Sequence, residues 1–461
     1  MKKTNRQSHP SSFRDSSGFI FYEDRTLYRQ VNKEYKENYD MLMNSGLYAA
    51  LVDTNLLVKC EEMSSKIKKD HLAYKILKPE PVPFISYPYE WCFSQLKDAA
   101  LATLNIQKTA LKYEMSLKDA SAYNIQFVNG KPLLIDTLSF EKYCEGQPWI
   151  AYRQFCQHFL APIALMSHKD VRLNQLLKIY LDGIPLNLAS TLLPLRTRCM
   201  LSLLSHIHLH SKSQNHFADK GKSLKSNRIS RRSFLGLLEH LISTIEKLKW
   251  RPKGTEWAEY YDATNYSETA FAHKKEVLKS FLKKSPSSKT IWDLGANTGE
   301  FSRIASGFCN QVISFDIDYA AVEKNYLACV ESNEKKIIPA VLDITNPSPG
   351  IGWENKERLS LLQRGPADSA IALALLHHLA ISNNTPLEKI ADFFSKACNT
   401  LIIEFIPKED SQVKRLLLNR EDIFHDYTQG SFEKKFKSNF RIKESVKNKN
   451  SCRTLYLMQK K

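Results

Sequence analysis

The second half of the chain is expected to fold as an α/β domain with a mainly parallel sheet, and three observations predict this. Apolar strand-like runs alternate with amphipathic helix-like stretches from about residue 254 onward, a pattern typical of a parallel sheet with helices on both faces. A glycine loop follows the first of these strands. Two strand-like runs with no helix between them end the sequence, and so short a connection makes them antiparallel.

The elements of this half follow one another in a regular order. Strands are expected at residues 290–294, 311–315, 337–342, 370–375, 400–405, 440–446 and 453–458, and helices at 269–284, 320–334 and 386–396, with one more opening at Glu300.

The loop after the first strand carries the most chemical information. Residues 293–299 read Asp-Leu-Gly-Ala-Asn-Thr-Gly. Glycine has no Cβ, so Gly295 and Gly299 allow the backbone to approach a ligand closely. Asp293 ends the strand, and open α/β sheets bind ligands at that edge. The pattern predicts a site for a nucleotide-type cofactor.

Residues 254–461 resemble the class I S-adenosylmethionine-dependent methyltransferases, through the 293–299 loop and two further strand-terminal acids, Asp316 and Asp343. The resemblance implies a Rossmann-like sheet of seven strands, parallel except for the antiparallel last strand. It implies S-adenosyl-L-methionine as the cofactor, with the loop around Asn297 leaving room for its methionine part.

The same resemblance assigns roles to individual residues. Asp316 accepts hydrogen bonds from the ribose hydroxyls, with Asp318 as the alternative ligand. Asp343 accepts from the adenine amino group, and Ile344 packs on the ring. Tyr261 belongs to an aromatic segment that folds over the cofactor in many of these enzymes. An NAD site is the rival, but the loop lacks the third glycine of that fingerprint.

Three residues at strand ends are candidates for acceptor chemistry. His377 and His378 follow the fourth strand, where the resemblance places the transferred methyl group, and a histidine there can serve as a general base. His377 is the preferred one. Glu404 ends the fifth strand and can position an amine or hydroxyl. The alternative for Glu404 is a salt bridge to Lys408 or Arg415.

Residues 17–210 are expected to form an α+β accessory domain. Within it, Asp119, Asn124 and Asp136 resemble the catalytic and metal-binding loop of protein kinases and aminoglycoside-type phosphotransferases. Leu117 replaces the usual histidine, and no glycine-rich phosphate loop lies upstream. The departures favour a degenerate kinase-like fold, used for substrate recognition, over an active phosphotransferase. A chance similarity in an unrelated domain is the other alternative.

The remaining segments are polar. Residues 1–16 are expected to be a disordered tail, 211–232 a flexible basic linker with seven Lys or Arg against one Asp, and 233–253 a connecting helix before the domain at 254–461. The net charge of the 461 residues is +17, which favours anionic partners such as nucleic acid. Nothing indicates a transmembrane segment or a metal site.

Nine scattered cysteines predict reduced thiols and a cytoplasmic protein. The sequence therefore predicts a cytoplasmic, two-domain S-adenosylmethionine-dependent methyltransferase whose acceptor is a small molecule, protein or RNA. The alternatives are a kinase-like phosphotransferase, joined to a cofactor-sensing domain, that uses Asp119, Asn124 and Asp136, and a non-enzymatic nucleic-acid-binding protein that uses the basic linker.

Overall fold

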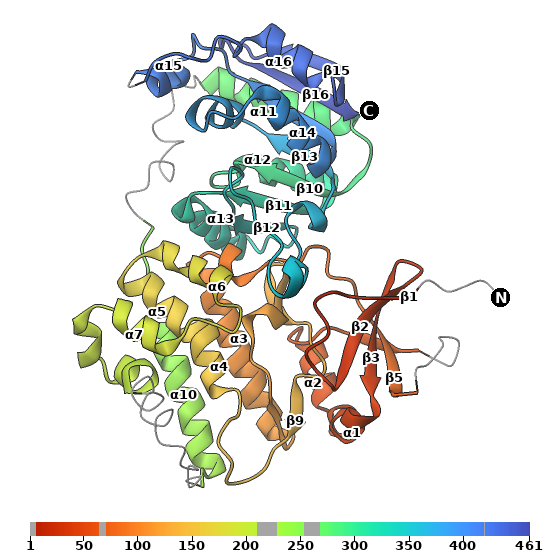
Figure 1. Cartoon of the computed structure of the whole chain (residues 1–461), viewed down its shortest axis with the longest axis vertical. Coiled ribbons are helices and arrows are strands. Elements are labelled where there is room, and N and C mark those ends of the chain that lie inside the picture. The colour runs from red at the N-terminus through yellow and green to blue at the C-terminus, as the bar shows by residue number, and fades with distance from the viewer. Residues whose placement is uncertain (1–5, 64–70, 210–227, 253–267, 419) are drawn as a thin grey trace, which may run out of the picture. The chain divides into compact units, whose positions relative to one another are not determined.

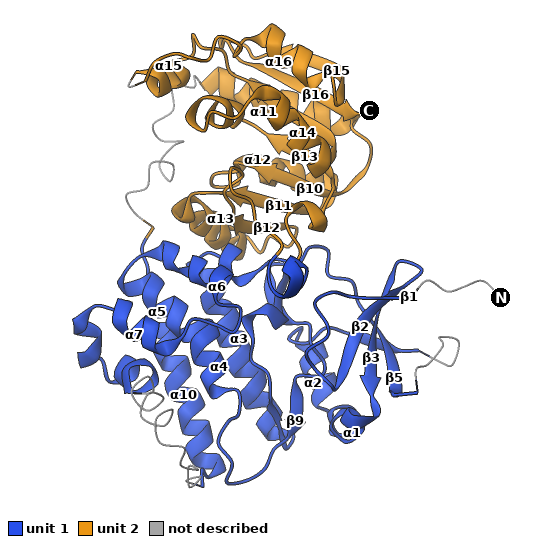
Figure 2. Ribbon diagram, in the orientation of Figure 1, with its two compact units in different colours: residues 1–251, 351–358 blue, residues 252–350, 359–461 orange. Residues whose placement is uncertain are grey.

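The computed structural model describes residues 6–63, 71–209, 228–252, 268–418 and 420–461. Two compact units make up the chain (Figure 2). Unit 1 contains residues 1–251 and 351–358, and unit 2 contains residues 252–350 and 359–461. Within these described ranges, no helix is long and apolar enough to cross a membrane.

Unit 2 is built on one seven-stranded sheet (Figure 1) with the strand order β12-β11-β10-β13-β14-β16-β15. The first five strands of unit 2, β10 to β14, pair in parallel with one another. β16 is antiparallel to both of its neighbours, β14 and β15. The strands are β10 (Ser288–Leu294), β11 (Cys309–Asp316), β12 (Ile337–Val341), β13 (Ala367–Ala372), β14 (Cys398–Phe405), β15 (Phe440–Lys447) and β16 (Thr454–Lys460). The expected parallel sheet with a terminal antiparallel hairpin is confirmed.

The parallel strands of this sheet are buried on both faces, whereas the edge strand β15 is partly exposed. Ile291 and Val312 join one apolar cluster with Leu278 and Phe281 of the preceding helix. Trp292 is the next residue along β10 and points to the opposite face, and it is also buried. Burial on both faces explains why the strands read as continuous apolar runs. The helices are α11 (Glu268–Lys284), α12 (Glu300–Ala305), α13 (Tyr319–Glu331), α14 (Leu387–Ala397), α15 (Ser411–Leu417), α16 (Gln429–Phe436) and the π-helix η11 (His378–Ser382).

Unit 1 begins with a five-stranded antiparallel sheet in the order β1-β2-β3-β5-β4. Its strands are β1 (Arg6–Ser8), β2 (Gly18–Glu23), β3 (Thr26–Asn32), β4 (Cys60–Glu62) and β5 (Ala73–Pro79). Two helices, α1 (Lys36–Asn44) and α2 (Leu47–Asp53), lie between β3 and β4 in the chain. They are separate because Gly46 adopts φ +90°.

The rest of unit 1 is mostly helical. Two short strand pairs, β6 with β9 and β7 with β8, follow its long helix α3. These elements are α3 (Phe93–Lys112), β6 (Met115–Leu117), β7 (Ile125–Val128), β8 (Lys131–Leu134), β9 (Phe140–Lys142), α4 (Tyr152–Phe155), α5 (Ala161–His168), α6 (Leu176–Ile179), α7 (Leu186–Leu192), α8 (Leu201–Leu203), the π-helix η7 (Leu204–Leu209) and α10 (Arg231–Lys247).

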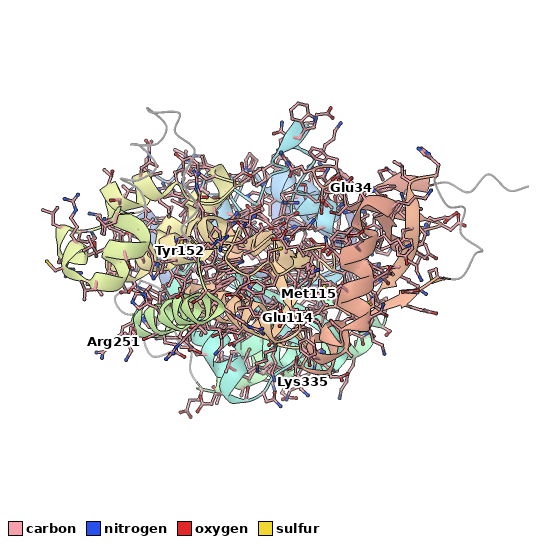
Figure 3. The ribbon with its side chains drawn as sticks, turned by 90° about the horizontal axis from the view of Figure 1, so that it is seen from below. Glu34, Glu114, Met115, Tyr152, Arg251 and Lys335 are labelled. Carbon is pink, nitrogen blue, oxygen red and sulfur yellow. The ribbon has the colours of Figure 1, made fainter. Side chains whose placement is uncertain are left out.

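The segment boundaries differ from the expected ones in three places. Residues 6–8, expected in the disordered tail, form β1 and pair with β2. The helix expected at 233–253 is α10, which packs on α3 inside unit 1. Arg231 at its start pairs with Glu114 at 2.5 Å (Figure 3 labels Glu114). Residues 351–358, between β12 and β13 in the chain, belong to unit 1. Most of the basic linker, 210–227, lies outside the described residues.

Candidate functional site

A cavity of about 280 Å³ lies at the carboxyl ends of the parallel strands in unit 2. This is the edge at which open α/β sheets bind ligands. Residues that directly follow β10, β12 and β13 line it, together with side chains of α11 and η11. The lining residues are Phe271, Lys274, Gly295, Asn297, Phe301, Asp316, Ile317, Leu342, Asp343, Ile344, Thr345, Leu373, Ala374, Leu375, His378, Leu379, Ser382 and Asn383.

The loop after β10 forms part of the cavity wall through Gly295 and Asn297. Both have positive φ, +78° and +51°. A Cβ on Gly295 would lie 3.3 Å from a methyl carbon of Leu375, so glycine keeps this side of the cavity open. The backbone N–H of Asn297 donates to Oδ2 of Asp316 at 2.7 Å, which ties the loop to the end of the neighbouring strand.

Asp316 and Asp318 are distinguished by the structure. Asp316 lines the cavity, whereas Asp318 caps α13 by accepting from the backbone N–H of Ala320 at 2.8 Å. The side chain of Asp316 is almost fully buried, and this burial raises its pKa to about 6. The position therefore selects Asp316 over Asp318 as the residue available to a ligand.

Asp343 and Ile344 follow β12 and line the same cavity. Oδ1 of Asp343 accepts from the backbone N–H of Thr345 at 2.8 Å and from its hydroxyl at 2.6 Å. These bonds hold a tight turn and fix the carboxylate. The three strand ends thus bring together five residues expected at the cofactor site from the sequence: Gly295, Asn297, Asp316, Asp343 and Ile344.

Two expected cofactor residues, Asp293 and Gly299, do not line the cavity. Asp293 is buried and accepts from the hydroxyl of Ser302 on α12 at 2.6 Å. Its burial raises its pKa to about 7. A Cβ on Gly299 would lie 2.2 Å from the side-chain oxygen of Asn325. Both residues therefore stabilise the loop through contacts with the protein and not through the cavity wall. Tyr261 lies outside the described residues.

The two histidines are placed differently from the expectation. His378 lines the cavity, and His377, the preferred candidate, is 2% exposed and does not. Nδ1 of His377 is buried and has no hydrogen-bond partner among the described residues. Burial lowers the pKa of His378 to about 4, far from the range in which a general base works best near neutral pH. The register of the turn after β13, which no sequence pattern specifies, decides which ring faces the cavity.

Glu404 is also away from the cavity wall. Its side chain is fully buried and pairs with Lys274 at 2.7 Å, not with Lys408 or Arg415. Lys408 pairs with Asp422 instead, at 2.8 Å. The structure therefore does not support a direct contact between Glu404 and the reacting groups. Lys274 itself does line the cavity. Burial lowers the pKa of Lys274, and Glu404 opposes that shift.

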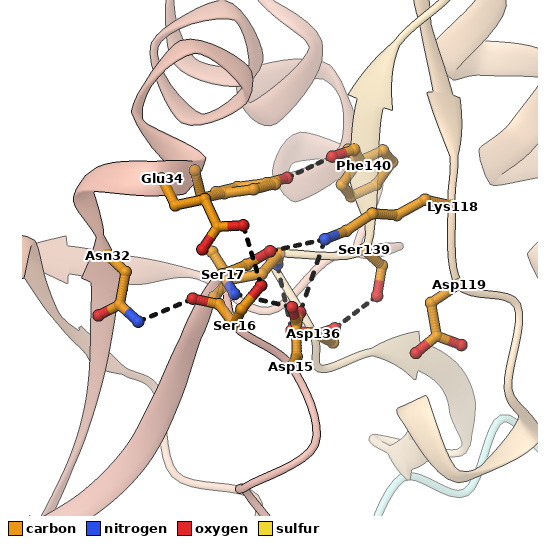
Figure 4. Close-up of polar contacts among 12 residues, drawn as sticks. Asp15, Ser16, Ser17, Asn32, Glu34, Lys118, Asp119, Asp136, Ser139 and Phe140 are labelled. Carbon is orange, nitrogen blue, oxygen red and sulfur yellow. Dashed lines mark hydrogen bonds and ion pairs between the residues drawn. The ribbon is translucent and has the colours of Figure 1, made fainter.

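The kinase-like residues of unit 1 form a second polar cluster (Figure 4). Figure 4 shows Asp136 beside Ser139, whose hydroxyl donates to it at 2.5 Å. Asp136 also pairs with Arg29 of β3. Burial alone would raise the pKa of Asp136, but the Arg29 guanidinium and hydrogen-bond donors hold it below its ordinary value. Asp119 accepts from Gln154 at 2.8 Å and from Asn124 at 3.1 Å.

Lys118 lies beside these acids (Figure 4). Its ammonium donates to the hydroxyl of Ser17 at 2.7 Å, lies 3.6 Å from Asp15 and stands over the ring of Tyr35. Asp15 and Ser17, just before β2, thus contact Lys118 of this cluster, and the carboxylate of Asp15 offsets its positive charge. In the part of the chain that the structure describes, no group of three His, Cys, Asp or Glu side chains suited to a metal ion is found.

Comparison with curated proteins finds one relative along almost the whole chain. The chain is 34% identical over 458 residues to the nodulation protein NoeA of Rhizobium meliloti (strain 1021), covering 97% of this chain and 95% of that protein. No family model matches the sequence.

Two of the solved structures that are similar to a part of the chain are methyltransferases. The N-methyltransferase NodS from Bradyrhizobium japonicum WM9 in complex with S-adenosyl-l-homocysteine is 12% identical, with 45% of this chain and 93% of that chain covered and a TM-score of 0.33. The magnesium protoporphyrin IX methyltransferase ChlM from Synechocystis PCC 6803 with bound SAM is 14% identical, with 44% and 89% covered and a TM-score of 0.28.

Proposed function

The chain belongs to the family of the nodulation protein NoeA, and we propose that it is a methyltransferase that transfers the methyl group of S-adenosylmethionine to an acceptor. One observation carries this proposal: the loop after β10, Asp316 and Asp343 surround a single cavity at the carboxyl edge of the sheet. The three successive strands thus offer one set of groups to each of three parts of the cofactor, its methionine part, its ribose and its adenine.

Each part of the cofactor is bound by different residues. Asp316 accepts hydrogen bonds from the ribose hydroxyls, Asp343 accepts one from the adenine amino group, and Ile344 packs on the adenine ring. Gly295 and Asn297 leave room for the methionine part. The cofactor supplies an activated methyl group, so the chain's own contribution is alignment of donor and acceptor and exclusion of water. The apolar side chains of Leu373, Leu375 and Leu379 beside His378 form the wall that meets the acceptor.

Calorimetry with S-adenosylmethionine tests the proposal. The wild-type chain is expected to bind, and Asp316→Ala is expected to bind about 100-fold more weakly, because two charge-assisted hydrogen bonds are lost. Asp136→Ala in unit 1 is the matched control and is expected to leave the affinity unchanged. Absence of binding by the wild-type chain would refute the function.

Unit 1 supports a second, weaker proposal, a kinase-like fold without phosphotransfer. Its antiparallel sheet is followed by helices and by Asp119, Asn124 and Asp136 in the expected order. The Arg29–Asp136 pair occupies the carboxylate that a phosphotransferase uses for magnesium. A thermal-shift titration with ATP and magnesium is expected to show no stabilisation. A shift that disappears in Asp136→Ala would favour phosphotransfer instead.

Two further proposals concern the setting of the protein. All nine cysteines are unpaired thiols, which supports a reducing, cytoplasmic location.

The basic segment 211–232 supports an anionic partner such as RNA. Deletion of 211–232 is expected to weaken RNA binding and to reduce its salt dependence. An unchanged affinity and salt slope would remove the nucleic-acid proposal.

A further inference from the structure

Residues 351–358, between β12 and β13 in the chain, fold as part of unit 1, although the residues on both sides of them belong to unit 2. Ile351 and Arg358 close this segment into a hairpin, because the backbone N–H of each donates to the carbonyl of the other, at 3.1 and 3.0 Å. Within the hairpin, Oε2 of Glu357 accepts from the backbone N–H of Trp353 at 3.1 Å. The hairpin 351–358 therefore has a defined structure of its own.

Two charged contacts join the hairpin to the rest of unit 1. Nε and Nη2 of Arg14 donate to the two carboxylate oxygens of Glu357, both at 2.8 Å, and the Glu357 side chain is only 4% exposed. These bonds hold the pKa of Glu357 below its ordinary value. The guanidinium of Arg358 lies 4.6 Å from the centre of the Tyr123 ring, whose face attracts a cation. A bidentate ion pair and a cation–π contact thus bind the hairpin.

Both contacts lead to one loop of unit 1, residues 118–124, which is the loop that resembles a kinase catalytic loop. Tyr123 belongs to this loop. Lys118 begins it, and its Nζ lies 3.6 Å from Asp15, the neighbour of Arg14 in the chain (Figure 4). In a phosphotransferase the corresponding loop positions the reacting groups. In this chain it contacts the hairpin and also the segment that binds the hairpin.

A short, proline-rich connection joins the hairpin to the cavity of unit 2. The turn on the cavity wall runs from Asp343 to Thr345, and residues 346–350 read Asn-Pro-Ser-Pro-Gly. Each proline fixes its own φ and restricts the residue before it, so this connection has few conformations. The carbonyl of Ser348 accepts from the backbone N–H of Leu361 at 2.9 Å, which ties the chain entering the hairpin to the chain leaving it. The position of the hairpin therefore restricts where the turn can lie.

We infer that the kinase-like loop of unit 1 anchors the hairpin 351–358, and that the hairpin in turn positions Asp343 for recognition of the adenine base. Glu357 and Arg358 are then positioning residues, and neither of them lines the cavity. This role gives the kinase-like loop a task that requires no phosphotransfer. The inference rests on the proposed methyltransferase function, in which Asp343 accepts from the adenine amino group.

The test compares two ligands that differ at one group of the base. S-Adenosylhomocysteine carries the 6-amino group of adenine, whereas S-inosylhomocysteine has an oxygen there and offers no amino donor. The wild-type chain is expected to bind S-adenosylhomocysteine about tenfold more tightly in calorimetry, because a hydrogen bond to a charged acceptor is lost with the second ligand. The ratio of the two affinities reports the position of Asp343, and Asp343→Ala is expected to bring it to about one.

Arg14→Met and Arg358→Met each remove one anchor of the hairpin. Each is expected to lower the ratio at least about threefold, because the carboxylate of Asp343 is no longer held at the amino group. Arg14→Lys keeps the charge beside Glu357 and is expected to restore most of the ratio. Arg172→Met is the matched control, because the Arg172 side chain is 76% exposed and pairs only locally, with Asp170 at 2.7 Å. Its ratio is expected to equal that of the wild-type chain.

The outcomes distinguish the inference from the function. If the wild-type chain binds neither ligand, the proposed function fails. If it binds both and the two anchor variants weaken them equally or not at all, the function stands and the positioning role of the hairpin is overturned. A wild-type ratio of one overturns that role as well, since Asp343 then does not recognise the amino group. A fall of the ratio in Arg172→Met would mean that the effect is not specific to the hairpin.

Discussion

Asp136 of unit 1 and Asp316 of unit 2 are carboxylates at or just after the end of a strand and are largely shielded from water, yet their pKa values shift in opposite directions. Asp136 is held below the ordinary value, because the Arg29 guanidinium outweighs its burial. Asp316 is raised to about 6, because burial dominates and its hydrogen-bond donors are backbone N–H groups. In the described residues Asp316 forms no ion pair, and it borders a cavity.

The difference shows what separates a ligand site from a self-contained cluster. In unit 1 each acid is bound by side chains of the protein: Arg29 for Asp136, Gln154 and Asn124 for Asp119. In unit 2, Asp316 accepts from the backbone N–H groups of Asn297 and Asp318, Asp343 accepts from Thr345, and both acids line the cavity. A ligand that brings hydroxyl or amino donors completes the second arrangement, whereas in the first it has to displace a protein group.

The largest expected effect is on the stability of unit 1. Arg29→Ala leaves Asp136 buried without its cation, and removing one partner of a buried pair typically costs about 3–5 kcal/mol. Hydrogen-exchange mass spectrometry is expected to show lower protection in β3 and β7–β8. S-Adenosylhomocysteine binding in unit 2 is expected to be unchanged. Full protection in Arg29→Ala would mean that the pair does not stabilise unit 1.

A smaller effect is expected for Gly299→Ala in unit 2. Gly299 has φ +81°, and an added Cβ would meet the buried side chain of Asn325 at 2.2 Å. Left-handed strain together with the forced shift of Asn325 is expected to cost about 2 kcal/mol. Protection of α12 and α13 is expected to fall while unit 1 is unaffected. Gly307→Ala, with nothing within 4 Å of the added carbon, is the control.

The sheet of unit 2 was predictable because its parallel strands contain apolar runs that are visible in the local sequence. The terminal hairpin followed from a loop too short for a helix, and Asp316 and Asp343 from their places at strand ends. Predicting which neighbour faces the cavity requires the register of each turn. For this reason His377 was preferred over His378, and Gly299 was counted as a cofactor contact although it packs on Asn325.

Ion pairs between residues far apart in the chain could not be predicted from the sequence either. Arg29 and Asp136 are 107 residues apart, and Lys274 and Glu404 are 130 apart. A salt bridge for Glu404 was anticipated, but only to the sequence neighbours Lys408 or Arg415. One local signal was present: Lys274 falls on the buried stripe of α11 with Ala270, Val277 and Leu278. A lysine on the apolar face of an amphipathic helix indicates a buried partner.

The smallest expected effect is a pH dependence that distinguishes the two acids. The carboxylate form of Asp316 is the better acceptor for ribose hydroxyls, and a pKa of about 6 leaves about one tenth of it ionised at pH 5. The affinity for S-adenosylhomocysteine is therefore expected to fall up to about tenfold between pH 7.5 and 5. Asp316→Asn is expected to bind weakly and with a flatter profile. An unchanged affinity of the wild-type chain at pH 5 would contradict the role of Asp316.

Stability without ligand should change in the opposite sense in unit 2. Asp316 and Asp293, with pKa values of about 6 and 7 in the folded chain, bind protons that the unfolded chain releases above about pH 4. Their contribution therefore stabilises unit 2 as the pH falls from 7.5 to 5. Asp136 has a lowered pKa, so its contribution to unit 1 is fully present in this range and is lost only below about pH 4. The largely buried His377 and His378 of unit 2 have lowered pKa values and act in the opposite sense, so the contribution of Asp316 is measured against Asp316→Asn. Hydrogen exchange at matched intrinsic rates is expected to show that the protection of β10 and β11 in the wild-type chain, relative to Asp316→Asn, is greater at pH 5 than at pH 7.5. A difference that does not change with pH would contradict the raised pKa of Asp316.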